Sequence, residues 1–271
     1  MSAQQNTQPN KGTALITGAS TGIGAIYADR LANRGYDLVL VARDRKRLAA
    51  LAEQITSKTG RKVEILPADL TVKTDLAQVE QRLRSDASIT ALVNNAGFGA
   101  TASLIDSKID DMENMIQLNV TALTRLTSAV LPGFLERKDG LLINIASVVA
   151  LDPETLNGVY SGTKAFVVNL TQSLHKEVKD KGIRVQAVLP GATRTEFWDR
   201  ANLPVQHLPE QAVMTAEDMV DASLVGLDQG ELITIPALPE LGDWEKYEAA
   251  RKALGPNLSH KRPAARYGLS A

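Results

Sequence analysis

The pattern of apolar segments predicts an α/β fold, in which a doubly wound parallel sheet of about seven strands has helices on both faces. Three observations support this prediction. Short, nearly continuous apolar runs alternate with longer amphipathic stretches, as in strand–helix–strand units that are buried on both faces. A glycine-rich turn follows the first apolar run. Polar residues follow several later runs, at the carboxyl ends of parallel strands, where such sheets bind ligands.

The composition narrows the class of protein. The 271 residues suit one large domain, and no apolar run approaches the ~20 residues of a membrane span. The net charge of −1 gives no reason to expect a nucleic acid or a membrane as partner. The absence of cysteine excludes disulfides, cysteine nucleophiles and cysteine-ligated metals. We therefore predict a cytoplasmic protein without a metal site.

The first strand is expected over residues 13–17, and a glycine-rich turn follows it directly. The turn reads Gly18-Ala19-Ser20-Thr21-Gly22-Ile23-Gly24, and a helix pattern continues from it to Arg34. A strand, a glycine turn and a helix in this order place a diphosphate at the N-terminus of the helix. The glycine spacing is not the common G-x-G-x-x-G, and the alternative interpretation is a plain tight turn.

The alternation continues along the chain. Further strands are predicted over 37–42, 63–67, 91–93, 141–146, 184–189 and 231–235. Helices are predicted over 44–59, to about 85, over 110–138, from 215 and over 238–254. Asp44 and Thr215 are expected to cap the helices that they begin. Gly18, Arg43, Asp69 and Asn94 all fall at the ends of strands.

Tyr160 and Lys164 are four residues apart and would project from one face of a helix, about one turn apart. A nearby positive charge favours the phenolate, so we expect Lys164 to lower the pKa of Tyr160. Alone, this pair is weak evidence, and a partly exposed helix pair is the alternative.

Two other polar residues also have a structural alternative to a role in catalysis. Asn119 lies in the middle of a predicted helix, where it could simply face solvent, and Ser147 follows a strand, where it could cap a turn.

Taken together, these residues resemble the short-chain dehydrogenase/reductase family, in its shorter single-domain branch. The resemblance runs from about Gly12 to Ile235 and implies a Rossmann-type fold. The motifs that carry it are Thr17-Gly18-x-x-x-Gly22-x-Gly24, Asp69-Leu70, Asn94-Asn95-Ala96-Gly97, Asn119, Ser147, Tyr160-x-x-x-Lys164 and Pro190-Gly191 followed by Thr195. Residues 1–10 are polar and are expected to form a disordered tail. On the basis of the resemblance, residues 11–237 are expected to form a dinucleotide-binding catalytic domain. Residues 238–271 would add a helix and a basic tail to the same domain.

The resemblance also implies a role for each polar residue of the site. Tyr160 would be the general acid that protonates a carbonyl oxygen, and Ser147 would hydrogen-bond that oxygen. Lys164 would bind the nicotinamide ribose, and Asn119 would hold a water that connects Lys164 with solvent. The residues implied in NADP(H) binding are Gly18, Ser20, Thr21, Gly22, Ile23, Gly24, Arg43, Asp69, Leu70, Asn95, Ala96, Gly97, Tyr160, Lys164, Pro190, Gly191, Thr193 and Thr195.

Within that set, some residues are assigned to particular parts of the cofactor. Asp69 would meet the adenine ring, and Asn95 with Gly97 would line the adenosine ribose side. Thr193 and Thr195 would bind the carboxamide of the nicotinamide. All of these contacts are implied by the resemblance alone.

The end of the second strand predicts a preference for NADP(H) over NAD(H). Ala42 can neither bond the ribose 2′-hydroxyl nor repel a 2′-phosphate, and Arg43 has a planar guanidinium suited to phosphate oxygens. We interpret Asp44 as the helix cap, while the basic run 45–47 either adds positive charge or is simply solvated. The resemblance agrees, since a basic residue at the position of Arg43 marks NADP users. Thr21 is neutral where some of them carry a second basic residue, so NAD is not excluded.

The segment 192–214 has apolar and aromatic residues with little periodicity, and the resemblance places the substrate lid there. With Phe98 and Val148 near the cleft, the lid suggests a small, largely apolar carbonyl compound or secondary alcohol. The proposed lid residues are Phe197, Trp198 and Leu203. Roughly the last thirty residues, which include the basic segment 255–271, would pack on a neighbouring subunit, close over the substrate or stay partly disordered.

We therefore expect an NADP-dependent carbonyl reductase or alcohol dehydrogenase. The alternatives are a catalytically silent dinucleotide-binding regulator and an epimerase or dehydratase, but a non-enzyme has no physical need for all four catalytic residues. A homodimer or homotetramer is also expected, because two helices carry more apolar positions than one sheet face needs. These positions are Leu123, Leu126, Val130, Val167, Leu170 and Leu174.

Overall fold

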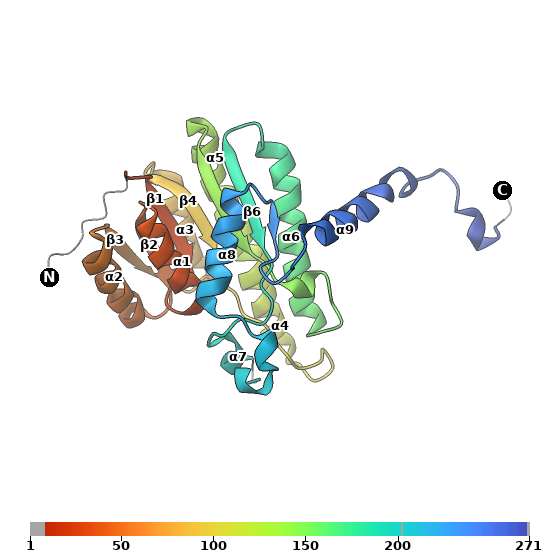
Figure 1. The fold of residues 1–271 in the computed structure, drawn as a ribbon, viewed down its shortest axis with the longest axis horizontal. Coiled ribbons are helices and arrows are strands. Elements are labelled where there is room, and N and C mark those ends of the chain that lie inside the picture. The colour runs from red at the N-terminus through yellow and green to blue at the C-terminus, as the bar shows by residue number, and fades with distance from the viewer. Residues whose placement is uncertain (1–8, 202, 270–271) are drawn as a thin grey trace. The chain divides into compact units, whose positions relative to one another are not determined.

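The computed structural model of the chain describes residues 9–201 and 203–269 (Figure 1). Most of the tail expected over residues 1–10 therefore lies outside the described residues. The chain divides into two compact units, one that ends at Pro236 and one that spans Ala237–Ala271, and each is described by itself. That both units belong to the same domain stays a prediction.

A parallel sheet of seven strands forms the centre of the first unit, in the order β3-β2-β1-β4-β5-β6-β7. The strands are β1 (Thr13–Thr17), β2 (Asp37–Ala42), β3 (Val63–Pro67), β4 (Ile89–Asn94), β5 (Gly140–Ile145), β6 (Ile183–Val188) and β7 (Ile233–Thr234). The predicted fold class is confirmed. The order of strands reverses between β1 and β4, which places the ligand site of such a sheet at the carboxyl ends of these strands.

The last strand is shorter than the predicted 231–235. Only Ile233 and Thr234 pair with β6, because the backbone N–H of Glu231 instead bonds the Gly226 carbonyl at the end of the preceding helix. The short strand still completes the sheet.

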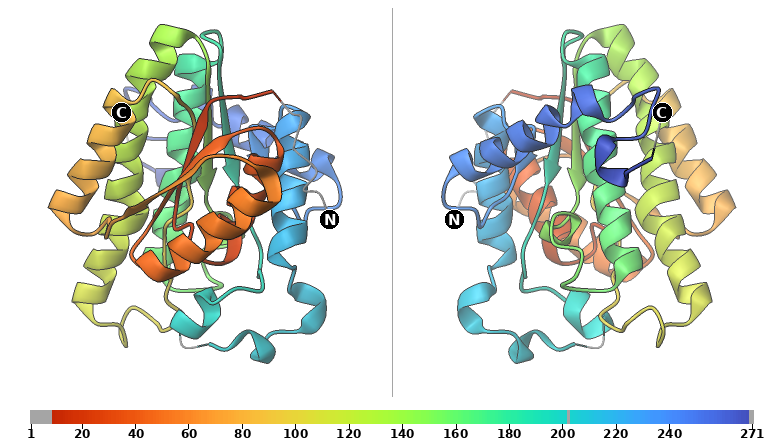
Figure 2. Two further views of the ribbon diagram at one scale, coloured as in Figure 1. Left: turned by 90° about the vertical axis from the view of Figure 1, so that its left-hand side faces the viewer. Right: turned by 90° about the vertical axis from the view of Figure 1, so that its right-hand side faces the viewer.

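Helices cover both faces of the sheet. The α-helices described in the first unit are α1 (Gly22–Asn33), α2 (Arg45–Thr59), α3 (Lys73–Ser85), α4 (Ile109–Ile116), α5 (Leu123–Arg137), α6 (Gly158–Val178), α7 (Phe197–Arg200) and α8 (Ala216–Asp228). Buried residues of α1, α2 and α8 share one hydrophobic core with the sheet. Those of α3, α5 and α6 share the other, and Figure 2 shows these three helices together on one side of the strands.

Side-chain caps fix where several helices begin. Asp44 accepts from the backbone N–H of Arg47, and Thr215 accepts from that of Asp218, so both predicted caps are confirmed. Asn157 caps α6 and also donates to the carbonyl oxygen of Ala102 at 2.7 Å. This second bond ties the start of α6, the helix that carries Tyr160, to the loop after β4.

The predicted single helix over 110–138 is interrupted. A π-helical segment, η1 (Gln117–Ala122), lies between α4 and α5, and Asn119 is in its middle. Asn119 is buried and faces the interior, so the solvent-facing alternative does not hold. Segments of π-helix are rare and often mark functional sites.

Five of the six apolar positions offered as evidence of an oligomer do not support it, while the sixth, Leu170, is only partly buried. Leu126, Val130 and Leu174 are buried in the core between the helices and their own sheet. Leu123 and Val167 are also buried within the chain. The first unit therefore needs these side chains for its own core, and that reason for an oligomer is wrong.

The second unit contains one longer helix, α9 (Leu241–Ala253), which agrees with the predicted helix over 238–254. No residue of α9 is buried, and the rings of Trp244 and Tyr247 stack with their centroids 5.3 Å apart. Among the residues that the structure describes, no helix is both long and apolar enough to cross a membrane.

Candidate active site

A cleft of about 1090 Å³ lies at the carboxyl ends of the strands of the first unit. Residues that follow six of the seven strands line it, so the cleft collects segments that are far apart in the sequence. The predicted site residues that line it are Gly18, Ser20, Thr21, Gly22, Ile23, Arg43, Asp69, Leu70, Asn95, Ala96, Gly97, Ser147, Tyr160, Lys164, Pro190, Gly191, Thr193, Thr195, Phe197, Trp198 and Leu203. Gly24 and Asn119 support this lining from behind.

The glycine turn after β1 leaves no room for side chains. Gly18 has a positive φ of +65°, and a Cβ atom on it would lie 2.8 Å from the Asn95 amide nitrogen. A Cβ on Gly24 would collide with the carbonyl oxygen of Gly18. The turn therefore brings α1 close to the sheet, and the first residues of α1 face the cleft without a side-chain cap from Thr21. Such a helix N-terminus favours phosphate oxygens.

The Thr17 hydroxyl holds the glycine turn against the loop after β4, a role that the sequence analysis missed. It accepts from the backbone N–H groups of Asn95 and Ala96, each at 3.0 Å. The Asn95 amide nitrogen donates back to the carbonyl oxygens of Thr17 and Gly18. Both amide hydrogens of Asn95 are thus engaged by the protein, so Asn95 supports the turn as well as lining the cleft.

Arg43 and Asp69 face one another at the ends of β2 and β3. The Arg43 guanidinium, with a side chain 74% exposed, lies 3.8 Å from a carboxylate oxygen of Asp69. Burial raises the pKa of Asp69, but hydrogen bonds from Thr71 and the charge of Arg43 outweigh this and hold the pKa below its usual range. At neutral pH the site thus has a charged acceptor and a charged donor side by side.

Tyr160 lies buried at the other end of the cleft. Its ring packs in an apolar cluster with Met112, Met115 and Val149. Burial raises the pKa of the Tyr160 phenol to about 12, and the hydrogen bond with Ser147 lowers it in part. The Ser147 hydroxyl also contacts the carbonyl oxygen of Pro190 at 3.4 Å.

Lys164 is buried one turn along α6 from Tyr160. Its ammonium group donates to the carbonyl oxygen of Ile145 at 2.9 Å and lies 5.8 Å from the centroid of the Tyr160 ring. Burial lowers the pKa of Lys164 to about 8. We expected the pKa of Tyr160 to be lowered. This prediction is wrong, because burial of the phenol raises its pKa by more than the hydrogen bond with Ser147 lowers it.

The side-chain amide of Asn119 makes hydrogen bonds behind the lining of the cleft. Its oxygen accepts from the backbone N–H of Phe98, and its nitrogen donates to the carbonyl oxygen of Phe98 and to the Thr163 hydroxyl. A Cβ on Gly97 would lie 3.0 Å from the Asn119 oxygen and 3.5 Å from the Lys164 nitrogen. The π segment thus brings Asn119 close to the loop that lies beside Lys164.

Part of the predicted lid lies over Tyr160. The rings of Phe197 and Tyr160 are 5.8 Å apart between centroids, and those of Phe197 and Trp198 are 5.3 Å apart. The Trp198 indole donates to the carbonyl oxygen of Thr193 at 2.9 Å, which anchors α7 to the loop after β6. The cleft is therefore apolar where it adjoins Tyr160.

Comparison with known proteins agrees with this geometry. Residues 12–205 match the family model described as short chain dehydrogenase. The chain belongs to the short-chain dehydrogenase/reductase family. Within this family, an uncharacterized oxidoreductase of Staphylococcus epidermidis is 32% identical over 207 residues, which cover 74% of this chain and 88% of that protein.

Two solved structures of this short-chain dehydrogenase/reductase type are similar over nearly the whole chain. A short-chain dehydrogenase from Sphingobium yanoikuyae in complex with NADPH is 50% identical, with a TM-score of 0.91, and the match covers 93% of this chain and 98% of that one. The bulky-bulky ketone specific alcohol dehydrogenase from Comamonas testosteroni is 44% identical, with a TM-score of 0.88, covering 95% of this chain and 99% of that one.

This short-chain dehydrogenase/reductase binds NADP(H), and its cleft fits the cofactor. The glycine turn is a cradle that a Cβ atom on Gly18 would fill, and it leaves the N-terminus of α1 open to a diphosphate. Arg43 offers an exposed guanidinium at the end of β2, where the 2′-phosphate belongs. Lys164 and Thr193 would hold the nicotinamide end, near the buried hydroxyls of Ser147 and Tyr160.

Proposed function

We propose that the protein is an NADP(H)-dependent oxidoreductase of the carbonyl reductase or alcohol dehydrogenase type. It transfers a hydride between nicotinamide and a small, largely apolar ketone, aldehyde or secondary alcohol. The observation that carries this proposal is the burial of Ser147, Tyr160 and Lys164 at one end of a dinucleotide cleft, beneath the aromatic ring of Phe197.

In this proposal Tyr160 supplies the proton and Ser147 positions the carbonyl oxygen. Bound NADPH supplies the hydride. The Tyr160 hydroxyl gives its proton to the oxygen as negative charge develops there, and the Ser147 hydroxyl donates a hydrogen bond to the same oxygen. The charge of Lys164 stabilises the phenolate that Tyr160 becomes. Asn119 would hold a water on the path by which the proton returns.

The lining of the cleft supports an apolar substrate. Around Tyr160 the walls are formed by side chains of Phe98, Val148, Leu156, Phe197 and Leu203. Arg200 also lines the cleft, but its guanidinium is engaged by the Glu196 carboxylate at 2.8 Å. The ketone specificity of the Comamonas testosteroni enzyme is in keeping with such a pocket.

The first experiment is a spectrophotometric measurement of NADPH oxidation with a panel of carbonyl compounds. We expect turnover with apolar alkyl and aryl ketones and much weaker turnover with keto acids and sugar phosphates of similar size. Strong preference for the charged compounds would overturn the assignment of the pocket. If the protein bound NADPH without reducing any member of the panel, the alternative of a silent regulatory protein would be favoured.

Arg43 is expected to set the preference for NADP(H) over NAD(H). In the variant Arg43→Ala, loss of a charge-assisted contact of about 1.5–3 kcal/mol should lower kcat/KM for NADPH by roughly 10- to 100-fold. The value for NADH should stay nearly unchanged, since NADH has no 2′-phosphate. Equal losses for both cofactors would mean that Arg43 only supports the fold, and a wild-type protein that favours NADH would contradict the preference outright.

We also propose that the protein is a homodimer or homotetramer. Support comes from apolar side chains that remain exposed on three helices, α4, α5 and α6. They are Ile109, Ile116, Leu135 and Phe166. Light scattering at micromolar concentration should give at least twice the monomer mass, and a monomer mass would refute the proposal. The expected cytoplasmic location stays a prediction.

A further inference from the structure

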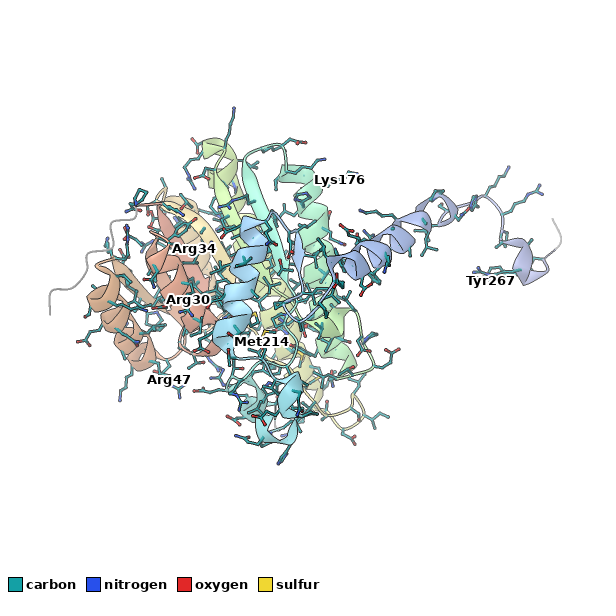
Figure 3. All side chains as sticks on the ribbon, viewed as in Figure 1. Arg30, Arg34, Arg47, Lys176, Met214 and Tyr267 are labelled. Carbon is teal, nitrogen blue, oxygen red and sulfur yellow. The ribbon has the colours of Figure 1, made fainter. Side chains whose placement is uncertain are left out.

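An ion pair connects two segments that belong to opposite halves of the sheet. Arg47 lies in the first turn of α2, and Glu196 lies directly before α7, 149 residues further along the chain. One guanidinium nitrogen of Arg47 lies 2.8 Å from both carboxylate oxygens of Glu196. Figure 3 labels Arg47 at the same end of the first unit as the segment 192–214.

Both partners of this pair line the cofactor cleft. Close to the pair, Thr195 approaches the glycine turn so closely that a Cβ on Gly22 would lie 3.0 Å from its methyl group. Arg47 is also 3.5 Å from the Asp44 carboxylate, on the turn that follows Arg43. The pair therefore lies between the place of the 2′-phosphate and the lid segment.

The Glu196 carboxylate is held in its charged form by its neighbours. Hydrogen bonding from Arg47 and the nearby charge of Arg200 keep the pKa of Glu196 below its usual range. The side chains of Arg47 and Glu196 are 48% and 44% exposed, so the ion pair is accessible to solvent and not buried in the core. Exposed pairs of this kind contribute little to stability, so a stronger anion can replace the carboxylate.

We propose that Arg47 is a second binding residue for the 2′-phosphate of NADP(H), and that Glu196 competes with this phosphate for it. The phosphate carries more negative charge than a carboxylate and presents three acceptor oxygens. When it binds, the Arg47 guanidinium turns from Glu196 to the phosphate, and Glu196 keeps its bond with Arg200. NAD(H) lacks the 2′-phosphate that would displace the carboxylate, so the ion pair between Arg47 and Glu196 stays formed with NAD(H) bound. The inference rests on the NADP(H) binding assigned above and adds a residue to its specificity.

The test is a double-mutant cycle on binding, measured by calorimetry with NADP+, NAD+ and the fragment 2′,5′-ADP. Arg47→Gln should weaken NADP+ and 2′,5′-ADP about tenfold and leave NAD+ unchanged, since one charge-assisted contact is lost. Glu196→Gln should strengthen NADP+ and 2′,5′-ADP about two- to fivefold, because the competing carboxylate is gone. The double variant should match Arg47→Gln alone, because Glu196 acts only through Arg47.

Asp199→Asn is the matched control. Asp199 is an exposed acid on α7, the short helix that directly follows Glu196. It lies outside the cleft lining and makes no ion pair within the described ranges 9–201 and 203–269. It should leave all three affinities unchanged, whereas a gain equal to that of Glu196→Gln would mean a general charge effect and overturn the proposal. Additive effects in the double variant, or equal losses for NADP+ and NAD+ in Arg47→Gln, would also overturn it. Because the readout is binding, the proposed reaction can fail while this inference stands.

Discussion

Replacing Tyr160 by Phe should lower turnover by roughly 100-fold or more and leave NADP(H) affinity little changed. The substitution keeps the ring, and with it the contacts to Met112, Met115 and Phe197. It removes only the hydroxyl that is proposed to give its proton to the substrate. The measurements are kcat with the best ketone of the panel and the dissociation constant of NADPH by fluorescence.

Tyr27→Phe is the matched control for this variant. Tyr27 is a buried residue of α1, and its hydroxyl hydrogen-bonds the Ser223 hydroxyl at 2.5 Å. It packs in the core that α1 shares with α8 and the sheet, away from the cleft. Its loss should change thermal stability and leave turnover nearly normal. Near-normal turnover in Tyr160→Phe would remove Tyr160 from the reaction.

Replacing Lys164 by Met should make the protein more stable at neutral pH while lowering turnover at least 100-fold. The lowering of the Lys164 pKa from 10.5 to about 8 corresponds to about 3 kcal/mol of unfavourable burial. Loss of the charge-assisted hydrogen bond to Ile145 offsets about 1.5 kcal/mol. A gain of roughly 1.5 kcal/mol in the free energy of unfolding at pH 7 should therefore appear in chemical denaturation.

The pH dependence separates this explanation from simple repacking. Between about pH 8 and pH 10.5 the unfolded chain binds more protons at Lys164 than the folded protein does, so this group makes stability rise with pH. The penalty is present in full below pH 8 and is gone above pH 10.5. The advantage of Lys164→Met should shrink across this window, and a constant advantage would contradict the assigned pKa.

Lys176→Met provides the control, since Lys176 is an exposed lysine on the same helix (Figure 3). It should alter neither turnover nor the pH dependence of stability. If Lys164→Met were instead less stable than the wild type at pH 7, the ammonium would be stabilising the fold, and its burial would carry no cost.

Local sequence signals were enough to predict the strands, two of the helix caps and the edge of the sheet where the cleft lies, whereas the cofactor contacts were implied by the family resemblance. Asp44 and Thr215 cap helices through side-chain bonds that span only three residues, so their positions follow from local sequence. The glycine turn and the polar ends of the strands also meet where parallel strands require. These features depend on short-range geometry and on the rule that strand ends share one edge.

What the sequence could not predict depends on contacts between distant segments. The Thr17 bonds to the loop after β4 and the pair of Arg47 with Glu196 join residues separated by 78 and 149 positions. The pKa of Tyr160 is governed by how completely the lid and its cluster remove water, which no local pattern records. Asn119 did give a signal, as an unfavourable residue inside a helix, but its interpretation needed the backbone of Phe98 as a partner.

The π segment at Gln117–Ala122 holds one residue more than an α-helix would over the same turn. Deleting one residue here would allow an unbroken α-helix, and α4 and α5 would keep nearly their present faces, because the loss of the residue and the loss of the wider turn compensate one another. What would change is the placement of Asn119, whose amide bonds the backbone of Phe98 and the Thr163 hydroxyl. In an alignment, a gap at this point would therefore signal a site without these contacts, even where the flanking helices match.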